Sequence, residues 1–272
     1  MRIDMETLCL SLNQGIARIE FNRPEKANAI NARMWQELRE AMRWLDEARE
    51  ARVGILCAAG RHFSAGIDLN LLVDLKAGMA TPCAGRSREQ LRRSILDIQD
   101  TVTSIEKCTK PVIAAVHGAC VGGGVDIVAA CDLRYCCEDA WFCVMEIDIG
   151  LVADVGTLQR LPRLIGEGMA RELAYTGRRV TGTEAQAMRL VNRAYASTGE
   201  LMRGVEELAL VLAAKSPLAL RGTKEMITYA RDHTVADALN HVATWNAATM
   251  FSVDLDEALI ASRERRTPVF ED

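Results

Sequence analysis

Three acidic side chains stand in apolar surroundings in the middle of the chain. Asp126 falls in the apolar segment 125–131, and Glu146 and Asp154 share one loop whose other residues are mainly apolar. A carboxylate among apolar side chains is costly unless it does chemical work. Carboxylates that lie near one another acquire raised and coupled pKa values, which proton transfer at neutral pH requires. The three acids are therefore candidates for general acid–base catalysis.

Two glycine-containing turns are candidates for holding a negatively charged oxygen. The glycine triplet 122–124 precedes Asp126, and Ala65-Gly66 lies between a predicted strand and a helix that can begin at Asp68. Glycines at a helix start leave backbone N–H groups uncovered. Two such donors aimed at one oxygen stabilise an enolate, and one donor is typically worth about 3 kcal/mol of barrier. The alternative is that these glycines only allow a strand to pack closely on a helix.

Short buried strands and amphipathic helices are predicted around these turns. Asn31 is a predicted N-cap, and the helical pattern that dominates after residue 157 breaks at Pro217 and at 232–234. Gly, Pro, Thr and Ser between residues 76 and 88 predict a surface loop. The early strands and late helices predict an α/β core over residues 1–200 and a helical region over residues 201–272. The strands are expected over residues 8–12, 15–21, 53–57, 111–116, 133–136, 141–144 and 191–194.

Composition narrows the class of protein. The 272 residues are 49% hydrophobic and 26% charged, which is typical of a globular enzyme. No apolar run has the length of a membrane span, and the N-terminus lacks the features of a signal peptide, so a cytoplasmic location and no membrane partner are expected. The nine cysteines are scattered and lack paired C-x-x-C spacing, which argues against a metal site. The formal charge of −4 gives no general attraction to nucleic acid.

Four motifs in order give the chain a resemblance to the crotonase family, also called the enoyl-CoA hydratase/isomerase superfamily. They are NRPEKANA at 22–29, FSAGIDL at 63–69, HGACVGGG at 117–124 and TLQRLP at 157–162. Several motifs in the right order are far more specific than one glycine run. The resemblance implies an α/β fold, a crotonase-like spiral of ββα units with a helical C-terminal trimerisation region. It also implies acyl-CoA thioester substrates, no metal or redox cofactor, and self-association as a trimer or a dimer of trimers.

The resemblance also implies roles for individual residues. The N–H groups of Ala65 and Gly123 are expected to hold the thioester oxygen. Arg23 and Lys26 are expected to meet the CoA phosphates, although both could instead be exposed turn residues. The full set of expected substrate and CoA contacts is Arg23, Lys26, Ala27, Ala29, Ala65, Gly66, Ile67, Asp68 and Gly123.

The acidic residues select a reaction within the resemblance. Hydratases of the family have a glutamate at the position of Asp126, a second at that of Glu146, and a glycine-rich run at 152–155. The combination of Asp126, Glu146 and Asp154 is instead similar to the family's dienoyl-CoA isomerases. Converting a 3,5-dienoyl thioester into a 2,4-dienoyl thioester moves a proton from C2 to C6, which requires two separated carboxylates.

Glu146 and Asp154, eight residues apart on one loop, are therefore the predicted proton-transfer pair. Asp126 is predicted to hold or tune one of them through a shared hydrogen bond, and the sequence leaves open which acid serves C2. One alternative is an enoyl-CoA hydratase or another crotonase-type acyl-CoA lyase. An alternative of another class is an RNA-binding or scaffold protein, supported only by the arginines from Arg86 to Arg93.

Overall fold

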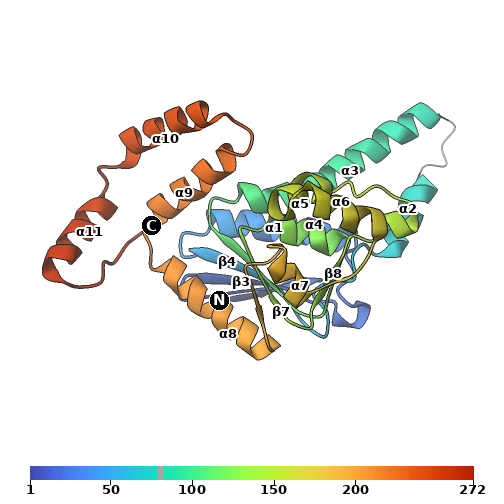
Figure 1. The fold of residues 1–272 in the computed structure, drawn as a ribbon, viewed down its shortest axis with the longest axis horizontal. Helices are drawn as coiled ribbons and strands as arrows, with labels where there is room; N and C mark the ends of the chain where they lie inside the picture. Colours follow the sequence, from blue (N-terminus) through green and yellow to red (C-terminus); the bar gives the residue numbers. More distant parts are fainter. Residues whose placement is uncertain (79–82) are drawn as a thin grey trace.

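A seven-stranded mixed sheet forms the centre of the protein (Figure 1). The computed structural model describes residues 1–78 and 83–272. The strands of this sheet are β1 (Arg2–Asp4), β2 (Leu8–Asn13), β3 (Ile16–Phe21), β4 (Val53–Ala58), β5 (Val112–Val116), β7 (Leu133–Cys137) and β10 (Arg193–Tyr195). They lie in the order β1-β2-β3-β4-β5-β7-β10. The predicted hairpin is confirmed as the antiparallel pair β2 and β3, and the pairs from β3 to β10 are parallel.

A smaller sheet supports the two glycine turns. It contains β6 (Ala119–Val121), β8 (Trp141–Cys143) and β9 (Val180–Thr181) in the order β6-β8-β9. An isolated parallel bridge joins Ser64 to Cys120. The segment before Ala65-Gly66 is therefore hydrogen-bonded to the strand that leads into the glycine triplet. The sequence pattern missed β6, which lies inside the glycine-containing motif 117–124, and β9, which has only 2 residues.

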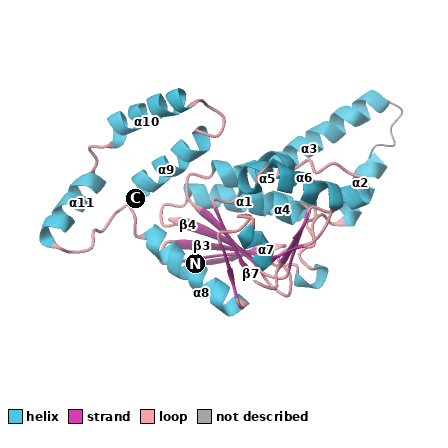
Figure 2. Cartoon of the chain, viewed as in Figure 1, coloured by secondary structure: helices cyan, strands magenta, loops and turns pink. Residues whose placement is uncertain are grey.

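Helices cover both faces of the large sheet (Figure 2). Figure 1 shows α8 (Thr198–Ala213) on one side and α1 (Ala32–Glu47), α3 (Ala84–Lys107), α4 (Gly123–Ala130) and α5 (Thr157–Ile165) on the other. The Asn31 side chain accepts a hydrogen bond from the Met34 N–H, so the predicted N-cap of α1 is confirmed. The remaining core helices are η1 (Pro24–Lys26), α2 (Leu69–Gly78), η2 (Glu146–Ile149), α6 (Glu167–Thr176) and α7 (Gly182–Ala187).

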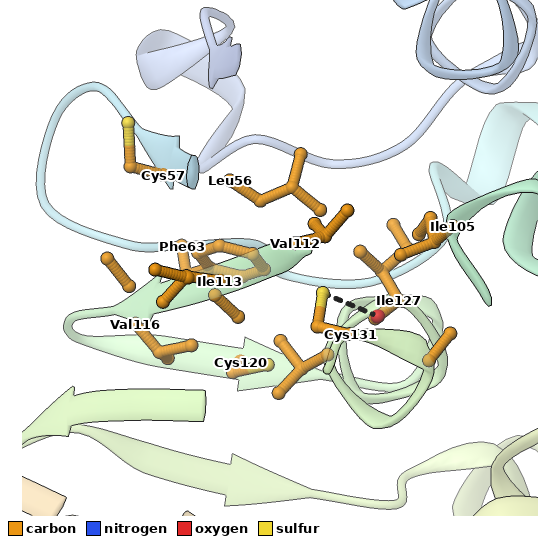
Figure 3. Close-up of a cluster of buried hydrophobic side chains, with 14 of the residues drawn as sticks. Leu56, Cys57, Phe63, Ile105, Val112, Ile113, Val116, Cys120, Ile127 and Cys131 are labelled. Atoms are coloured by element: carbon orange, nitrogen blue, oxygen red, sulfur yellow. Dashed lines mark hydrogen bonds between the residues drawn. The ribbon is translucent and has the colours of Figure 1, made fainter. Parts of the chain in front are cut away.

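The buried core lies directly beneath the glycine turns. Every residue of β5 is buried, and so is every residue of α4. Figure 3 shows Phe63, Ile113 and Ile127 among the apolar side chains that meet there, with the Cys131 thiol donating to the Ile127 carbonyl at 3.4 Å. Cys83 is the one exposed cysteine, and the other eight are buried. Those eight behave as small apolar core residues, as the sequence predicted.

The polar stretch between residues 76 and 88 is mostly helical, so the predicted loop is wrong over most of its length. Helix α2 continues to Gly78 and α3 begins at Ala84, while residues 79–82 lie outside the described part of the chain. Exposed arginines such as Arg86 and Arg88 are tolerated in a helix, so polar composition alone did not identify a loop here.

Three C-terminal helices extend to one side of the core (Figure 1). They are α9 (Pro217–Tyr229), α10 (Val235–Thr249) and α11 (Val253–Glu264). The two predicted breaks are confirmed, and a third, before the N-cap Ser252, was missed because Met250 and Phe251 continue the apolar pattern. Helix α8 buries Leu201, Val205 and Ala209 in the core, whereas α10 has no buried residue. Within the described residues, no helix combines the length and apolarity needed to cross a bilayer.

Candidate active site

A cavity of about 640 Å³ opens beside the two glycine turns. Its walls come from η1, the turn at 65–68, the start of α4, the loop 145–155, and helices α2 and α3. Asp126, Glu146 and Asp154 all contribute to the lining. Most of the other wall is apolar, including Leu72, Leu75, Leu91, Ile95 and Ile98 from α2 and α3. An apolar cavity with a few convergent polar groups is the usual form of a small-molecule site.

The two glycine turns lie against each other. Gly66 has a φ of +90°, and a Cβ on it would stand 2.9 Å from the Val121 carbonyl oxygen. Gly122 has a φ of +49°, and a Cβ on it would stand 3.0 Å from Glu146 Oε1. Both positions therefore require glycine for conformation and for space. The contact at Gly122 also shows that Glu146 lies beside the glycine turns.

The backbone donors differ in part from the prediction. The Ala65 N–H donates to the Ala27 carbonyl at 2.9 Å, so it is already engaged and cannot serve an oxyanion. The expectation that Ala65 supplies one donor is therefore corrected. Gly123 is the first residue of α4, and its N–H has no acceptor among the described residues. Its backbone borders the cavity, as expected of an oxyanion donor.

Ile67 supplies the second free donor. The Ile30 N–H donates to the Gly66 carbonyl at 2.8 Å, and the Asp68 N–H donates to the Ile30 carbonyl at 3.0 Å. This is the parallel bridge between Ile30 and Ile67, and in such a bridge the N–H of the bridged residue points to the opposite side. In the described part of the chain the Ile67 N–H has no acceptor, and Ile67 lines the cavity.

Asp126 is the most deeply buried acid of the site, with 1% of its surface exposed. Its Oδ1 accepts the Thr157 N–H at 2.6 Å. Burial raises its pKa to about 6, although the hydrogen bonding of Thr157 opposes the shift. The predicted shared hydrogen bond to another acid is wrong, because none joins Asp126 to Glu146 or Asp154 among the described residues. The negative charge of Asp126 is one of the causes that raise the pKa of Glu146.

Glu146 begins η2 at the edge of the cavity. Its Oε2 atom is buried and has no hydrogen-bond partner among the described residues. Burial raises the pKa of Glu146 to about 7, and the negative charges of Asp126 and Asp154 contribute to the shift. A carboxyl with a pKa near 7 can both accept and release a proton at neutral pH.

Asp154 lies farther along the same loop and borders solvent. Partial burial raises its pKa above the ordinary aspartate value, while its own backbone N–H opposes this shift. Its carboxylate makes no ion pair or side-chain hydrogen bond within the described residues. The structure therefore brings all three predicted acids to the lining of one cavity, where Asp126 is buried and Asp154 is exposed to solvent.

Arg23 is less available to a ligand than its charge suggests. Its Nη1 lies 3.2 Å from Asp68 Oδ2 and also donates to the Ala29 carbonyl. The Arg23 and Asp68 side chains are only 15% and 16% exposed. Arg23 therefore fastens η1 to the start of α2, and its charge is already paired when a ligand arrives.

Lys26 is exposed at the cavity mouth and has no ion-pair partner in the described part of the chain. Ala27 does not line the cavity, because its backbone turns inward to accept the Ala65 N–H, so its predicted ligand contact is not seen. The remaining expected contacts that line the cavity are Arg23, Ala29, Ala65, Gly66, Ile67, Asp68 and Gly123.

Asn28 is a structural residue that the sequence analysis did not single out. It is completely buried, has a φ of +53°, and its Nδ2 donates to the Ala59 and His62 carbonyls at 2.9 and 2.8 Å. Its Oδ1 accepts the Arg23 N–H at 2.8 Å. An asparagine between two alanines in a polar turn was the available signal, because asparagine tolerates the left-handed region.

Comparison with solved structures defines the class of protein. The enoyl-CoA hydratase of Bacillus anthracis superposes with a TM-score of 0.88 at 32% identity, covering 98% of this chain and 99% of that one. A putative enoyl-CoA hydratase of Streptomyces coelicolor gives a TM-score of 0.90 at 28% identity, with 98% and 95% coverage. The protein is therefore an enzyme with the crotonase fold, and the fold predicted from the sequence motifs is confirmed.

The family follows from the sequence comparison. The model of the enoyl-CoA hydratase/isomerase family matches residues 11–272, so this chain belongs to that family. It is 45% identical to the peroxisomal Delta(3,5)-Delta(2,4)-dienoyl-CoA isomerase of Arabidopsis thaliana over 98% of this chain and 96% of that protein. It is 41% identical to the mitochondrial human enzyme of that name over 94% of this chain and 78% of the human protein. Those compartments are the relatives' own, and the predicted cytoplasmic location stays a prediction.

Proposed function

We propose that the protein is a Δ3,5-Δ2,4-dienoyl-CoA isomerase, which moves a proton from C2 to C6 of a 3,5-dienoyl-CoA during the oxidation of unsaturated fatty acids. The observation that carries the proposal is a second carboxylate, Asp154, on the same cavity as Glu146 and with a raised pKa. Relatives that are 45% and 41% identical bear this name. The hydratase alternative is not favoured.

The reaction begins at the thioester oxygen. The Ile67 and Gly123 N–H groups have no acceptor among the described residues and both residues line the cavity, so the carbonyl oxygen of the bound thioester is proposed to accept both hydrogen bonds. Negative charge grows on this oxygen as the C2 proton leaves, so the two donors bind the dienolate more tightly than the substrate. Each donor of this kind contributes roughly 3 kcal/mol to lowering the barrier.

The position of each acid assigns its role. Glu146 lies against Gly122, next to the two donors, and therefore close to C1 and C2 of the acyl group. It takes the C2 proton, and the electron pair left on C2 spreads through the conjugated system to C6. Asp154 lies farther along the cavity and gives a proton to C6. After one turnover Glu146 is protonated and Asp154 is ionised, and exchange with solvent restores both.

The rest of the substrate follows from the same arrangement. Lys26 at the cavity mouth suits a CoA phosphate, since it is a flexible and unpaired cation. The apolar walls from α2 and α3 suit the acyl chain. The reaction leaves the oxidation state of the substrate unchanged and needs only proton transfer, so we propose that it uses no metal and no redox cofactor.

The function is tested by ultraviolet absorbance with 3,5-octadienoyl-CoA. The wild-type protein is expected to produce the band of the extended 2,4-dienoyl thioester. Asp154→Asn keeps the shape of the side chain but cannot donate a carboxyl proton, so its kcat is expected to fall by a factor of about 100 or more. Absence of the band, together with addition of water to a 2-enoyl-CoA by the wild type, would identify a hydratase instead.

We also propose that the protein self-associates as a trimer or a dimer of trimers. The proposal is supported by large apolar side chains exposed on the C-terminal helices and their connections, including Phe251 at 92% and Val253 at 82%. A nucleic-acid partner has no support beyond the α3 arginines, of which Arg93 is paired with Glu89 at 2.7 Å. A cytoplasmic location also remains part of the proposal, and fractionation of the source cells would measure it.

A further inference from the structure

The segment that carries Asp154 is a thin wall between two cavities. Asp154 and Val155 line the substrate cavity, and both also line a second cavity of about 750 Å³ on the other side. Ala153 and Val155 pack against the hydrophobic core, but the Asp154 peptide between them borders open space on both sides. Polar contacts to the backbone therefore help to fix the position of this peptide. The Asp154 carboxylate provides none, because it makes no hydrogen bond to another side chain among the described residues.

Gln99 holds the first peptide of this wall. It projects from α3, and its Nε2 donates to the Asp154 carbonyl oxygen at 2.6 Å. This contact joins residues 55 positions apart in the sequence. Because the carboxylate is attached to the same residue, the hydrogen bond fixes where the Asp154 Cα lies and therefore where the carboxylate can reach. Gln99 touches neither the carboxylate nor the space for the acyl chain.

Arg160 holds the next peptide. Its Nη1 donates to the Val155 carbonyl at 3.3 Å. The guanidinium lies so close to Gly156 that a Cβ there would stand 1.6 Å from Nη1, and Gly156 has a φ of +126°. Glycine at position 156 is thus required for the arginine to reach the wall.

The guanidinium of Arg160 is itself held from α3. Its Nη2 donates to Glu106 Oε2 at 2.6 Å, and Arg231 donates to the other oxygen of the same carboxylate at 2.5 Å. Burial alone would raise the pKa of Glu106, but the two arginines outweigh it and hold the pKa below the ordinary value. Glu106 therefore stays ionised through the neutral range and keeps Arg160 in one place.

We propose that Gln99 and the Arg160–Glu106 ion pair are positioning residues that hold the backbone of Asp154 and Val155, so that the Asp154 carboxylate reaches C6 of the dienolate. This inference rests on the proposed isomerase function. Proton transfer requires donor and acceptor within hydrogen-bond reach, and a displacement near 1 Å can lower the rate about 100-fold. Helix α3 thus sets the geometry of the second proton transfer without touching the substrate's reacting atoms.

The test compares two glutamines that border the same second cavity. Gln99→Met removes the donor while nearly preserving side-chain volume. Gln159→Met is the matched control, since Gln159 also lines that cavity but its side chain makes no hydrogen bond among the described residues. Both variants are assayed with 3,5-octadienoyl-CoA in D2O. The measurements are kcat, KM, the melting temperature and the C2 exchange per product. This last quantity is the amount of deuterium at C2 of the recovered substrate divided by the amount of product formed.

Gln99→Met is expected to lower kcat about 10- to 100-fold with KM nearly unchanged. C2 exchange per product is expected to rise by a similar factor, because Glu146 still removes the C2 proton while the dienolate waits longer for a proton at C6. The control is expected to match the wild type in every measurement. Both melting temperatures should stay within about 3 °C of the wild type, as for ordinary surface substitutions.

Other outcomes would overturn the inference. An unchanged kcat in Gln99→Met would show that Asp154 does not need this contact. A kcat that falls while C2 exchange per product stays constant would mean that Gln99 supports the whole site rather than the second transfer. These results contradict the inference alone when the wild type is active and Asp154→Asn is not. A wild type that produces no 2,4-dienoyl-CoA would overturn the proposed function as well.

Discussion

At the scale of single residues, the site depends on carboxylates that are kept difficult to ionise. Burial raises the pKa of Asp126 from 3.8 to about 6 and that of Glu146 from 4.5 to about 7. Each pKa is higher in the folded protein than in the unfolded chain. The free energy of unfolding therefore falls as the pH rises from the unfolded-state pKa to the folded-state pKa of the group. For Asp126 this loss amounts to about 3 kcal/mol above pH 6. The same effect of burial brings the pKa of Glu146 to about 7, where this carboxyl can accept and release a proton near neutral pH.

The interaction between these two acids predicts a shift in the pH dependence of the reaction. Glu146 must be ionised to take the C2 proton and Asp154 must be protonated to give one to C6, so kcat/KM is expected to depend on pH through both groups, with a midpoint near pH 7 that belongs to Glu146. Asp126→Asn keeps an oxygen that accepts the Thr157 N–H but removes a negative charge that raises the Glu146 pKa. The midpoint should therefore move to lower pH in this variant, as measured by kcat/KM between pH 5 and pH 9.

The direction of the shift is decisive for this interpretation. A midpoint that stays in place in Asp126→Asn would mean that burial alone sets the Glu146 pKa. A midpoint that moves to higher pH would mean that Asp126 does not act on Glu146 through repulsion. Glu40→Gln is a suitable control, because Glu40 lies on the exposed face of α1 and does not line the cavity.

At the scale of secondary-structure elements, Asn28 connects the pieces that carry the two turns. Its side chain joins η1 to the carbonyls of Ala59 and His62, and its own carbonyl accepts the Ser64 hydroxyl at 2.9 Å. Ser64 Oγ in turn accepts the Gly66 N–H at 3.1 Å. This chain of contacts determines which N–H groups near Ile67 remain free for a ligand.

Asn28→Ala is expected to destabilise the protein by about 3 kcal/mol or more. The substitution leaves the Ala59 and His62 carbonyls and the Arg23 N–H without partners, and a buried unpaired group costs about 1 to 3 kcal/mol. Gln14→Ala is the control, since Gln14 is also left-handed with a φ of +49° but is exposed. It should change stability by less than about 1 kcal/mol. Urea unfolding measures both, and equal losses would contradict the role of the Asn28 side chain.

The elements themselves were largely predictable from the sequence. The strand predicted over 111–116 is β5, and the helix start expected at Asp68 is α2, because buried runs and capping residues are local signals. The identity of the second free backbone donor, the Ile67 N–H, was not predictable from local signals. Ala65 is excluded only because its N–H meets Ala27, 38 residues earlier, and no local pattern carries that contact. The roles of Gln99 and Asn28 depend on contacts of the same long-range kind.

At the scale of the whole molecule, the chain combines a well-buried core with C-terminal helices that expose apolar surface. Val235, Leu239 and Val253 on these helices are 77%, 63% and 82% exposed. Surface of this kind is typical of an interface that is covered in an assembly. The charge of −4 spread over 272 residues is too small to oppose association strongly.

The assembly proposal predicts that a charge at Phe251 separates the subunits. Phe251 lies between α10 and α11 and is 92% exposed, so Phe251→Asp should fold normally yet place an unpaired carboxylate in any interface that covers it. Val211→Asp adds the same charge at another exposed apolar residue, 53% exposed on α8. Analytical ultracentrifugation is expected to find the wild type and Val211→Asp as trimers or dimers of trimers, and Phe251→Asp as monomers.

A monomeric wild type would show that the exposed helices serve another purpose. If Phe251→Asp stays assembled, subunits must meet through a different face, and the apolar C-terminal surface would need another partner.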